Sequence, residues 1–218
     1  RIESSAASDV YKRQTIGDIS FHEWLGDSWG VLFSHPKDFT PVCTTELGSL
    51  ARMKPEFDKR NVKVIGLSVD PVADHVKWLD DIKDVTGMKP DYPIIADEDL
   101  KIAKLYNMLE GDAGTTSMGR TAVDNQTVRT VFIIRPDKRI GLFLTYPMAT
   151  GRNFMELLRS IDSMQLTAKH KVATPADWKK GEEVIIVPSV KDDEAKKLFP
   201  GGWNAVKPYL RKVPDPSK

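Results

Sequence analysis

The sequence predicts an α/β fold, with a mixed central sheet flanked by helices and a small C-terminal α+β domain. Three observations support this prediction. Strand-like runs alternate with amphipathic helical segments over most of the chain, and two strand-like runs joined by a short turn then form a hairpin. Beyond about Thr167 the elements become short. The length of 218 residues suits one domain with an appendage.

The N-terminal part of the predicted sheet is a strand, a turn and a second strand within residues 15–33. Ile19 and Phe21 alternate with polar neighbours, which indicates a half-buried strand. A turn is predicted at residues 26–28, where glycine, aspartate and serine follow one another. The apolar run Trp29–Phe33 is expected to be the central strand.

The remaining elements follow from the same periodicities. The segment after Cys43 is expected to be helical, and a loop rich in Gly, Thr, Ser and Asp is expected at residues 110–126. Strands are predicted at 62–69, 92–96, 128–134 and 140–146, and helices at 72–87, at 100–106 and from Gly151 onward.

The sequence divides into three parts. Residues 1–14 show no apolar period and are interpreted as a divergent or artefactual N-terminal segment. Residues 15–166 form the predicted α/β domain. Residues 167–218 form the appendage, with short elements at 172–178, 183–188 and 192–198. About fifty residues are too few for a good core of their own.

Composition excludes several classes of protein. The net charge is +1 and acidic and basic residues are interspersed, so no nucleic-acid partner is expected. No run reaches the ~18 apolar residues of a membrane span. The chain has a single cysteine, which rules out an intrachain disulfide. A lone cysteine fits a reducing compartment, and we expect a cytoplasmic protein.

That cysteine, Cys43, lies where a buried strand passes through a proline-containing loop into a helix. Thr40 precedes the helix as an expected N-cap. The unpaired N–H groups and the positive dipole end of a first helical turn stabilise a thiolate. A lone cysteine is more often a small buried hydrophobe, and the local sequence decides between the two interpretations.

The string His35-Pro-Lys-Asp-Phe-Thr-Pro-Val-Cys-Thr-Thr-Glu-Leu47 contains the pattern Pro-x-x-x-Thr-x-x-Cys. It closely resembles the active-site signature of the one-cysteine peroxiredoxins of the peroxiredoxin-6 type. The resemblance extends from about Thr15 to the end of the chain. It implies a thioredoxin-like fold, and a C-terminal domain that contributes to a homodimer.

The resemblance implies a thiol-dependent peroxidase in which Cys43 attacks hydrogen peroxide or an organic hydroperoxide, including those of phospholipids. The product is a cysteine sulfenic acid. Arg129 matches the essential arginine of the family. A guanidinium stays charged and offers several fixed donors, so it can stabilise the thiolate.

The resemblance implies that Thr40 and Pro36 belong to the catalytic set with Cys43 and Arg129, and that Arg152 and His35 support it. Thr40 is expected to hydrogen-bond the sulfur and the peroxide oxygen together, and Pro36 to shield the pocket with a locked φ. Arg152 matches a second arginine that supports the site, and His35 is expected to tune the thiolate or to order water. Both Arg152 and His35 fit a purely structural role equally well.

No resolving cysteine exists in this chain, so an external thiol must reduce the sulfenic acid. In related proteins this thiol is often glutathione delivered by a glutathione transferase. No metal or other cofactor is expected. Transient contact with phospholipid surfaces is expected if phospholipid hydroperoxides are substrates.

A second motif, Gly26-Asp-Ser-Trp-Gly30, fits the G-x-S-x-G pattern of serine hydrolases. That motif needs a strand before the serine and a helix after it, whereas a strand follows here, which favours a simple turn. The resemblance nevertheless implies a calcium-independent phospholipase A2 activity at Ser28, His22 and Asp137. A third interpretation is a redox-dependent holdase or signalling protein.

Overall fold

The computed structural model of the protein describes residues 10–11, 15, 17–125 and 129–218. The chain forms two compact units, one ending at Phe154 and the other running from Met155 to Lys218. The predicted domain boundary after residue 166 lies further along, inside helix α5 (Phe154–Lys169). Of the segment 1–14, only Val10 and Tyr11 are described, as strand β1. They pair antiparallel with β2 (Ile19–Ser20).

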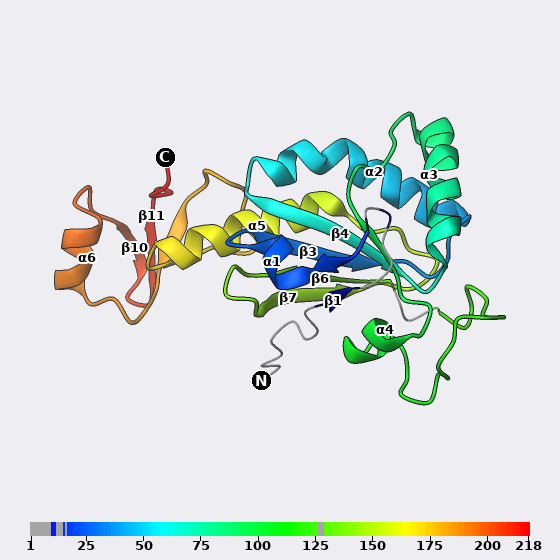
Figure 1. The fold of residues 1–218 in the computed structure, drawn as a ribbon. Helices are drawn as coiled ribbons and strands as arrows, with labels where there is room; N and C mark the ends of the chain where they lie inside the picture. Colours follow the sequence, from blue (N-terminus) through cyan, green and yellow to red (C-terminus); the bar gives the residue numbers. More distant parts are fainter. Residues whose placement is uncertain (1–9, 12–14, 16, 126–128) are drawn as a thin grey trace. The chain divides into compact units, whose positions relative to one another are not determined.

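The first unit is organised around a five-stranded mixed sheet (Figure 1). Across the sheet the strands are β5 (Ile94–Ala96), β4 (Val62–Ser68), β3 (Trp29–Ser34), β6 (Thr130–Ile134) and β7 (Ile140–Thr145). The first three are parallel, as expected for strands connected through helices. β6 is antiparallel to both β3 and β7. This arrangement confirms the predicted mixed sheet and the hairpin that ends it.

Helices cover the sheet on both faces. α2 (Pro41–Asp58) packs against α3 (Val72–Thr86) and β4, and the two helices lie on the same side of the sheet in Figure 1. On the other face, α1 (Phe21–Leu25) and α4 (Lys101–Leu105) join a core that includes Leu32 of β3. Because successive strand residues point to opposite faces, the neighbouring Phe33 packs instead against Tyr92.

The prediction for residues 15–33 was wrong in one element. Residues 21–25 form the short helix α1, where a strand was expected. Phe21 and Leu25 are both fully buried, and their i, i+4 spacing places them on one helical face. Gly26 then ends the helix at a φ of 54°, in the left-handed region that glycine tolerates. His22 therefore lies on a helix, not on a strand.

Helices α2 and α3 approach closely at Gly48. A Cβ atom at this position would overlap the side chain of Thr86, whose hydroxyl donates to the carbonyl of Ile82 at 2.7 Å. Arg52, one turn further along α2, donates to the carbonyl of Thr86 at 3.0 Å. These contacts fix the middle of α2, and the functional residues lie in its first two turns.

The second unit contains a four-stranded antiparallel sheet with its own small core around the fully buried Trp178. Its elements are β8 (Val172–Ala173), β9 (Val184–Ile186), α6 (Asp192–Leu198), β10 (Asn204–Lys207) and β11 (Leu210–Val213). The α+β character of the appendage is confirmed. The β10–β11 hairpin was not predicted, because every residue of β10 is exposed and no apolar alternation marks it.

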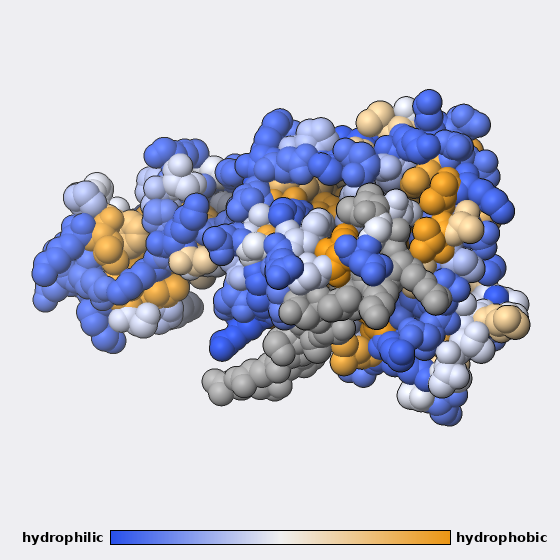
Figure 2. Space-filling model, in the orientation of Figure 1, coloured by the Kyte–Doolittle hydropathy of each residue, from blue (hydrophilic) through white to orange (hydrophobic). Residues whose placement is uncertain are grey.

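The surface is mostly hydrophilic on the face shown in Figure 2, in keeping with the interspersed charges of the sequence. Hydrophobic residues gather over α3, where Val76 and Val85 are exposed. Among the described residues, no helix has both the length and the apolar character needed to cross a bilayer.

Candidate active site

Cys43 lies in the first turn of α2, as the sequence predicts. Strand β3 ends at Ser34, the loop follows, and Pro41 occupies the start of the helix, where its missing N–H costs nothing. Thr40 is at the N-cap position with an extended backbone. The Cys43 side chain is only 1% exposed. A small molecule can therefore reach the sulfur only through a narrow opening.

Arg129, immediately before β6, contacts the sulfur directly. Its Nη2 donates to Cys43 Sγ at 3.4 Å, and its Nε donates to the carbonyl of Met148 at 3.1 Å. Its Nη1 donates to the carboxylate of Glu46. The three donors point in fixed directions, and the side chain is 2% exposed. The predicted pairing of Cys43 with Arg129 is thus present in the structure.

Glu46 joins the two predicted arginines into one cluster. Its Oε1 accepts bonds from the backbone N–H and the Nε of Arg152 at 2.7 and 2.9 Å, and its Oε2 accepts one from Nη2 at 2.7 Å. Burial by itself raises the pKa of Glu46, but the charges of Arg152 and Arg129 and the hydrogen bonds from Arg152 outweigh it, so the pKa lies below its usual value. With Glu46 ionised, two guanidinium groups face one carboxylate. One positive charge is left over beside Cys43.

Glu46 is a functional residue that the sequence analysis missed. In the sequence it stands out only as part of the string from His35 to Leu47. The available signal was its spacing, because residues i and i+3 share a helix face and Glu46 follows Cys43 by three. A carboxylate on the face that carries a buried cysteine requires buried cationic partners.

Residues 35–40, between β3 and α2, form the cysteine loop. Arg152 also binds the strands next to this loop. Its Nη1 donates to the carbonyls of Ser34 and Thr130 at 2.7 and 3.1 Å, at the ends of β3 and β6. The ring of Phe33 lies 5.1 Å from its guanidinium carbon. Arg152 makes no direct contact with the sulfur among the hydrogen bonds of the described residues. It holds Glu46, which in turn holds Arg129.

Thr40 and Pro36 border the cysteine loop. Thr40 Oγ1 donates its proton to the carbonyl of Lys37 at 2.8 Å. Its lone pairs therefore remain available to accept the O–H of a bound peroxide. The hydrogen bond shared with sulfur and peroxide stays a prediction. Pro36 is buried, and between the two residues Phe39 has a φ of 55°, an unusual conformation for a residue other than glycine.

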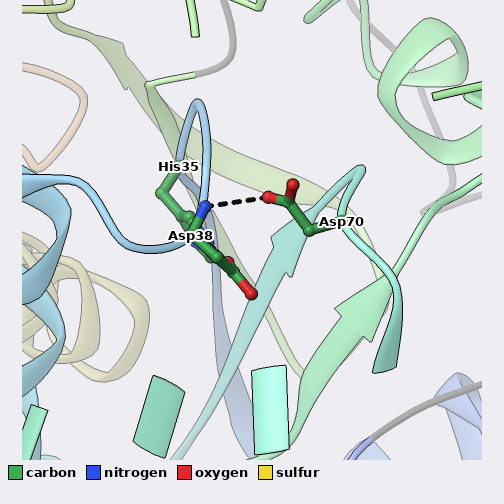
Figure 3. Close-up of side chains that lie close together, drawn as sticks. All are labelled: His35, Asp38 and Asp70. Atoms are coloured by element: carbon green, nitrogen blue, oxygen red, sulfur yellow. Dashed lines mark hydrogen bonds and ion pairs between the residues drawn. The ribbon is translucent and has the colours of Figure 1, made fainter. Parts of the chain in front are cut away.

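His35 belongs to a second buried network (Figure 3). Its Nε2 lies 2.6 Å from Asp38 Oδ1, and the other carboxylate oxygen of Asp38 bonds Nδ1 of His75. The backbone N–H of Asp38 donates to Asp70 Oδ2 at 2.9 Å. Both imidazoles and the Asp38 carboxylate are buried. The sequence analysis did not identify His75, which lies on α3.

The network shifts the pKa of two of its members. Burial raises the pKa of Asp38, but the hydrogen bonds from His35 and His75 outweigh it and lower the pKa from 3.8 to about 2. Burial lowers the pKa of His75, but the hydrogen bond and charge of Asp38 outweigh it, and the pKa lies above 6.5. Asp38 and His75 thus form an ion pair under the cysteine loop.

His35, Asp38 and Asp70 offer three ligand atoms within 4.8 Å of one another. The carboxylates of Asp38 and Asp70 and Nε2 of His35 already have protein partners. Asp70 accepts from the Ser68 hydroxyl at 2.9 Å and from the Lys37 ammonium at 3.1 Å, in addition to the bonds described above. A cation would have to displace these donors. The cluster is therefore interpreted as a hydrogen-bond network that anchors the loop.

The predicted hydrolase residues have other partners in the structure. Ser28 Oγ donates to Asn61 Oδ1 at 2.8 Å, so its proton is not directed at a histidine. Asp137 pairs with Arg135 at 3.3 Å and accepts the backbone N–H of Arg139 at 3.2 Å. Strand β3 follows Ser28, so the strand–serine–helix geometry of a hydrolase elbow is absent here. The phospholipase activity stays a prediction.

The Asp38–His75 pair makes stability depend on pH in two directions. The contribution of Asp38 is complete above pH 3.8 and is lost as the pH falls towards 2; that of His75 is complete below pH 6.5 and is lost as the pH rises through its higher folded pKa. His75→Gln should therefore lower the free energy of unfolding most between about pH 4 and 6.5, by about 3–5 kcal/mol. The loss of unfolding free energy should be smaller below about pH 4 and above the raised pKa of His75.

Urea denaturation of wild type and His75→Gln across this range measures the difference. His170→Gln, a change in the other compact unit, serves as the control. A stability difference that does not vary with pH would contradict the ion pair.

Residues 4–142 match the model of the AhpC/TSA family, and residues 163–202 match the C-terminal domain of 1-Cys peroxiredoxin. The first match begins before Thr15, where the sequence resemblance was expected to start. A 1-Cys peroxiredoxin from Dictyostelium discoideum is 53% identical over 210 residues, covering 96% of this chain and 83% of the relative. Peroxiredoxin-6 from Gallus gallus is 53% identical over 212 residues, covering 93% and 92%.

Solved structures of peroxiredoxins have the same fold as this chain. A yeast mitochondrial 1-Cys peroxiredoxin, described for its thiol resolving mechanism via glutathione/thioredoxin systems, superimposes with a TM-score of 0.91 at 50% identity, over 98% of this chain and 99% of that one. A cysteine-to-serine mutant of peroxiredoxin 6 from Arenicola marina gives 0.85 at 46% identity over the whole of both chains. With a buried cysteine held against an arginine on this fold, the chain belongs to the one-cysteine peroxiredoxin family.

Proposed function

We propose that the protein is a thiol-dependent peroxidase in which Cys43 is the nucleophile. The observation that carries the proposal is the guanidinium of Arg129, whose Nη2 lies 3.4 Å from Cys43 Sγ in a buried site. A fixed positive charge beside sulfur stabilises the thiolate, which is the reactive form of cysteine. Family membership and the paired arginines support the same conclusion.

The reaction proceeds by attack of the thiolate on one oxygen of the peroxide. An S–O bond forms while the O–O bond breaks, so the sulfur is oxidised by two electrons and the peroxide is reduced. The other oxygen leaves as hydroxide or alkoxide and takes a proton from water. Arg129 donors stabilise the charge as it moves from sulfur to the leaving oxygen, with little reorganisation because Glu46 and Met148 hold the guanidinium.

Regeneration requires an external thiol, because Cys43 is the only cysteine in the sequence. One thiol condenses with the sulfenic acid to give a mixed disulfide and water, and a second thiol then releases reduced Cys43 as a disulfide of the reductant forms. The yeast relative is described with glutathione/thioredoxin systems. Glutathione, delivered by a glutathione transferase, is accordingly the reductant we propose here.

The proposal predicts a single turnover without added reductant. Stopped-flow mixing of reduced protein with hydrogen peroxide should consume one equivalent of peroxide per chain, and Cys43→Ser should show no burst. Added glutathione should convert the burst into steady turnover. A burst of equal size in Cys43→Ser would refute the assignment of the nucleophile.

Arg129→Lys tests the guanidinium itself. Lysine keeps the positive charge but cannot donate to Cys43, Glu46 and the carbonyl of Met148 at once. The second-order rate constant with peroxide should fall by two orders of magnitude or more, as for loss of a preorganised donor. Arg135→Lys, on the hairpin side of β6, is the matched control. A rate for Arg129→Lys within threefold of wild type would show that the three fixed donors of the guanidinium are unimportant.

We also propose a homodimer formed through the edge strand β7. Among the described residues this strand ends the sheet, and its Phe143 is 49% exposed, so a monomer would present that edge unpaired within this part of the chain, with an apolar side chain on it. Sedimentation equilibrium should give about 49 kDa, twice the chain mass of 24.5 kDa. Phe143→Glu should shift the mass towards the monomer, whereas Val85→Glu, an exposed valine on α3, should not. A 24.5 kDa species at micromolar concentration in wild type would exclude the dimer.

A further inference from the structure

The long loop before β6 is connected to the cysteine loop by one buried side chain. Asn125 is 0% exposed, and its Nδ2 donates to the carbonyl oxygen of Pro36 at 3.1 Å. The two residues are 89 positions apart in the sequence. None of the motifs described above includes Asn125, and the peroxidase chemistry does not yet explain why a buried amide lies here.

Arg120 determines how this amide is oriented. Its Nε donates to Asn125 Oδ1 at 2.8 Å. Its Nη1 and Nη2 donate to the carbonyls of Ala113 and Asp124 at 2.7 and 2.6 Å. If the amide of Asn125 were turned over, its NH₂ would face the guanidinium and its oxygen would face the Pro36 carbonyl. Both contacts would be repulsive, so the donor can point only at Pro36.

A hydrogen bond to the Pro36 carbonyl can fix the backbone at the beginning of the cysteine loop. Proline has no N–H, so its carbonyl is the only backbone group through which it can hydrogen-bond. The backbone carbonyl of the next residue, Lys37, accepts a hydrogen bond from the Thr40 hydroxyl. Phe39 has a φ of 55°, which is unusual for a residue other than glycine. A strained loop of this kind persists only if its surroundings fix it. The Asp70 carboxylate holds the loop by accepting the backbone N–H of Asp38. Asn125 holds the beginning of the loop by donating to the Pro36 carbonyl.

We propose that Asn125 and Arg120 are positioning residues for the peroxidase reaction. Arg120 orients Asn125, and Asn125 holds the Pro36 peptide, which fixes the loop that carries Thr40, the N-cap residue of the helix that begins with the turn of Cys43. Among the hydrogen bonds of the described residues, none joins Asn125 to Cys43, Glu46 or Arg129. The pair therefore acts on the geometry of peroxide binding and not on the charge that stabilises the thiolate.

This inference rests on the proposed peroxidase function and separates two properties of the site. Thiolate stabilisation depends on Arg129 and Glu46, whereas peroxide alignment depends on the loop from Pro36 to Thr40. A residue that supports only the loop should change the rate with peroxide and leave the pH dependence of Cys43 alkylation unchanged. A general structural defect would change both, because water entering an opened site would weaken the stabilisation of the thiolate by Arg129 and shift the pH at which Cys43 becomes reactive.

The test compares Asn125→Ala and Asn125→Asp with wild type in the full-length protein. Asn125→Ala loses the bond to Pro36. Asn125→Asp keeps an acceptor for Arg120 but cannot donate to the Pro36 carbonyl when it is ionised. Both variants should lower the second-order rate constant with hydrogen peroxide about 10-fold or more, since small misplacements of catalytic groups are costly. The burst should remain one equivalent per chain, and the midpoint of the alkylation profile with iodoacetamide should not move.

Met118→Ala is the matched control, because this residue of the same loop is 87% exposed. It should react with peroxide at the wild-type rate. Arg120→Met should give part of the Asn125→Ala defect, and the double variant should be no slower than Asn125→Ala, since the two residues act through one bond.

Three outcomes would overturn the inference. Both Asn125 variants could react within twofold of wild type. Asn125→Asp alone could keep the wild-type rate, which would show that the bond to Pro36 is unimportant. The alkylation midpoint could shift together with the rate, which would place the effect on the thiolate. Failure of the peroxidase proposal would look different, since wild type itself would then show no burst.

Discussion

The site depends on one buried carboxylate placed between two guanidinium groups. Glu46 accepts donors from both Arg129 and Arg152, and all three side chains are almost inaccessible to water. Removing Glu46 would leave two buried guanidinium groups without their carboxylate, and breaking a buried pair in this way costs about 3–5 kcal/mol. The cluster holds more positive than negative charge, and Nη2 of Arg129 donates from it to Cys43. Electrostatic activation of the sulfur and rigidity of the arginines thus have the same source.

The same cluster explains why the fold brings these elements together. Arg152 donates to the carbonyls at the ends of β3 and β6, the two central antiparallel neighbours, while Glu46 comes from α2. Parallel β3 and β4 place α2 across the sheet, and the antiparallel β6 brings Arg129 back to the end of β3. On the opposite side of the cysteine loop, the Asp38–His75 pair links that loop to α3. The loop is therefore held between two charged networks.

The sequence predicted the sheet and its main helices, because long periodic segments carry that information, and the resemblance to a known family implied the pairing of Cys43 with Arg129. It did not reveal Glu46, His75 or Asn125. Glu46 shares a helix face with Cys43, but neither periodicity nor a local motif identifies the partners of these residues, which lie 83, 37 and 89 positions away. Helix α1 was missed because five residues scarcely show a period, and β10 because all its side chains are exposed.

The near-complete burial of Cys43 has a consequence for the two halves of the catalytic cycle. Hydrogen peroxide is about the size of two water molecules and can enter a site whose sulfur is 1% exposed. A tripeptide thiol is far larger, and its sulfur must come within bonding distance along the S–O axis. Hydrogen peroxide can react with the sulfur where it lies, whereas an external thiol must bring its own sulfur to an atom that its surroundings in the first turn of α2 almost completely cover. The burial of Cys43 therefore constrains the reduction of the sulfenic acid more than its formation.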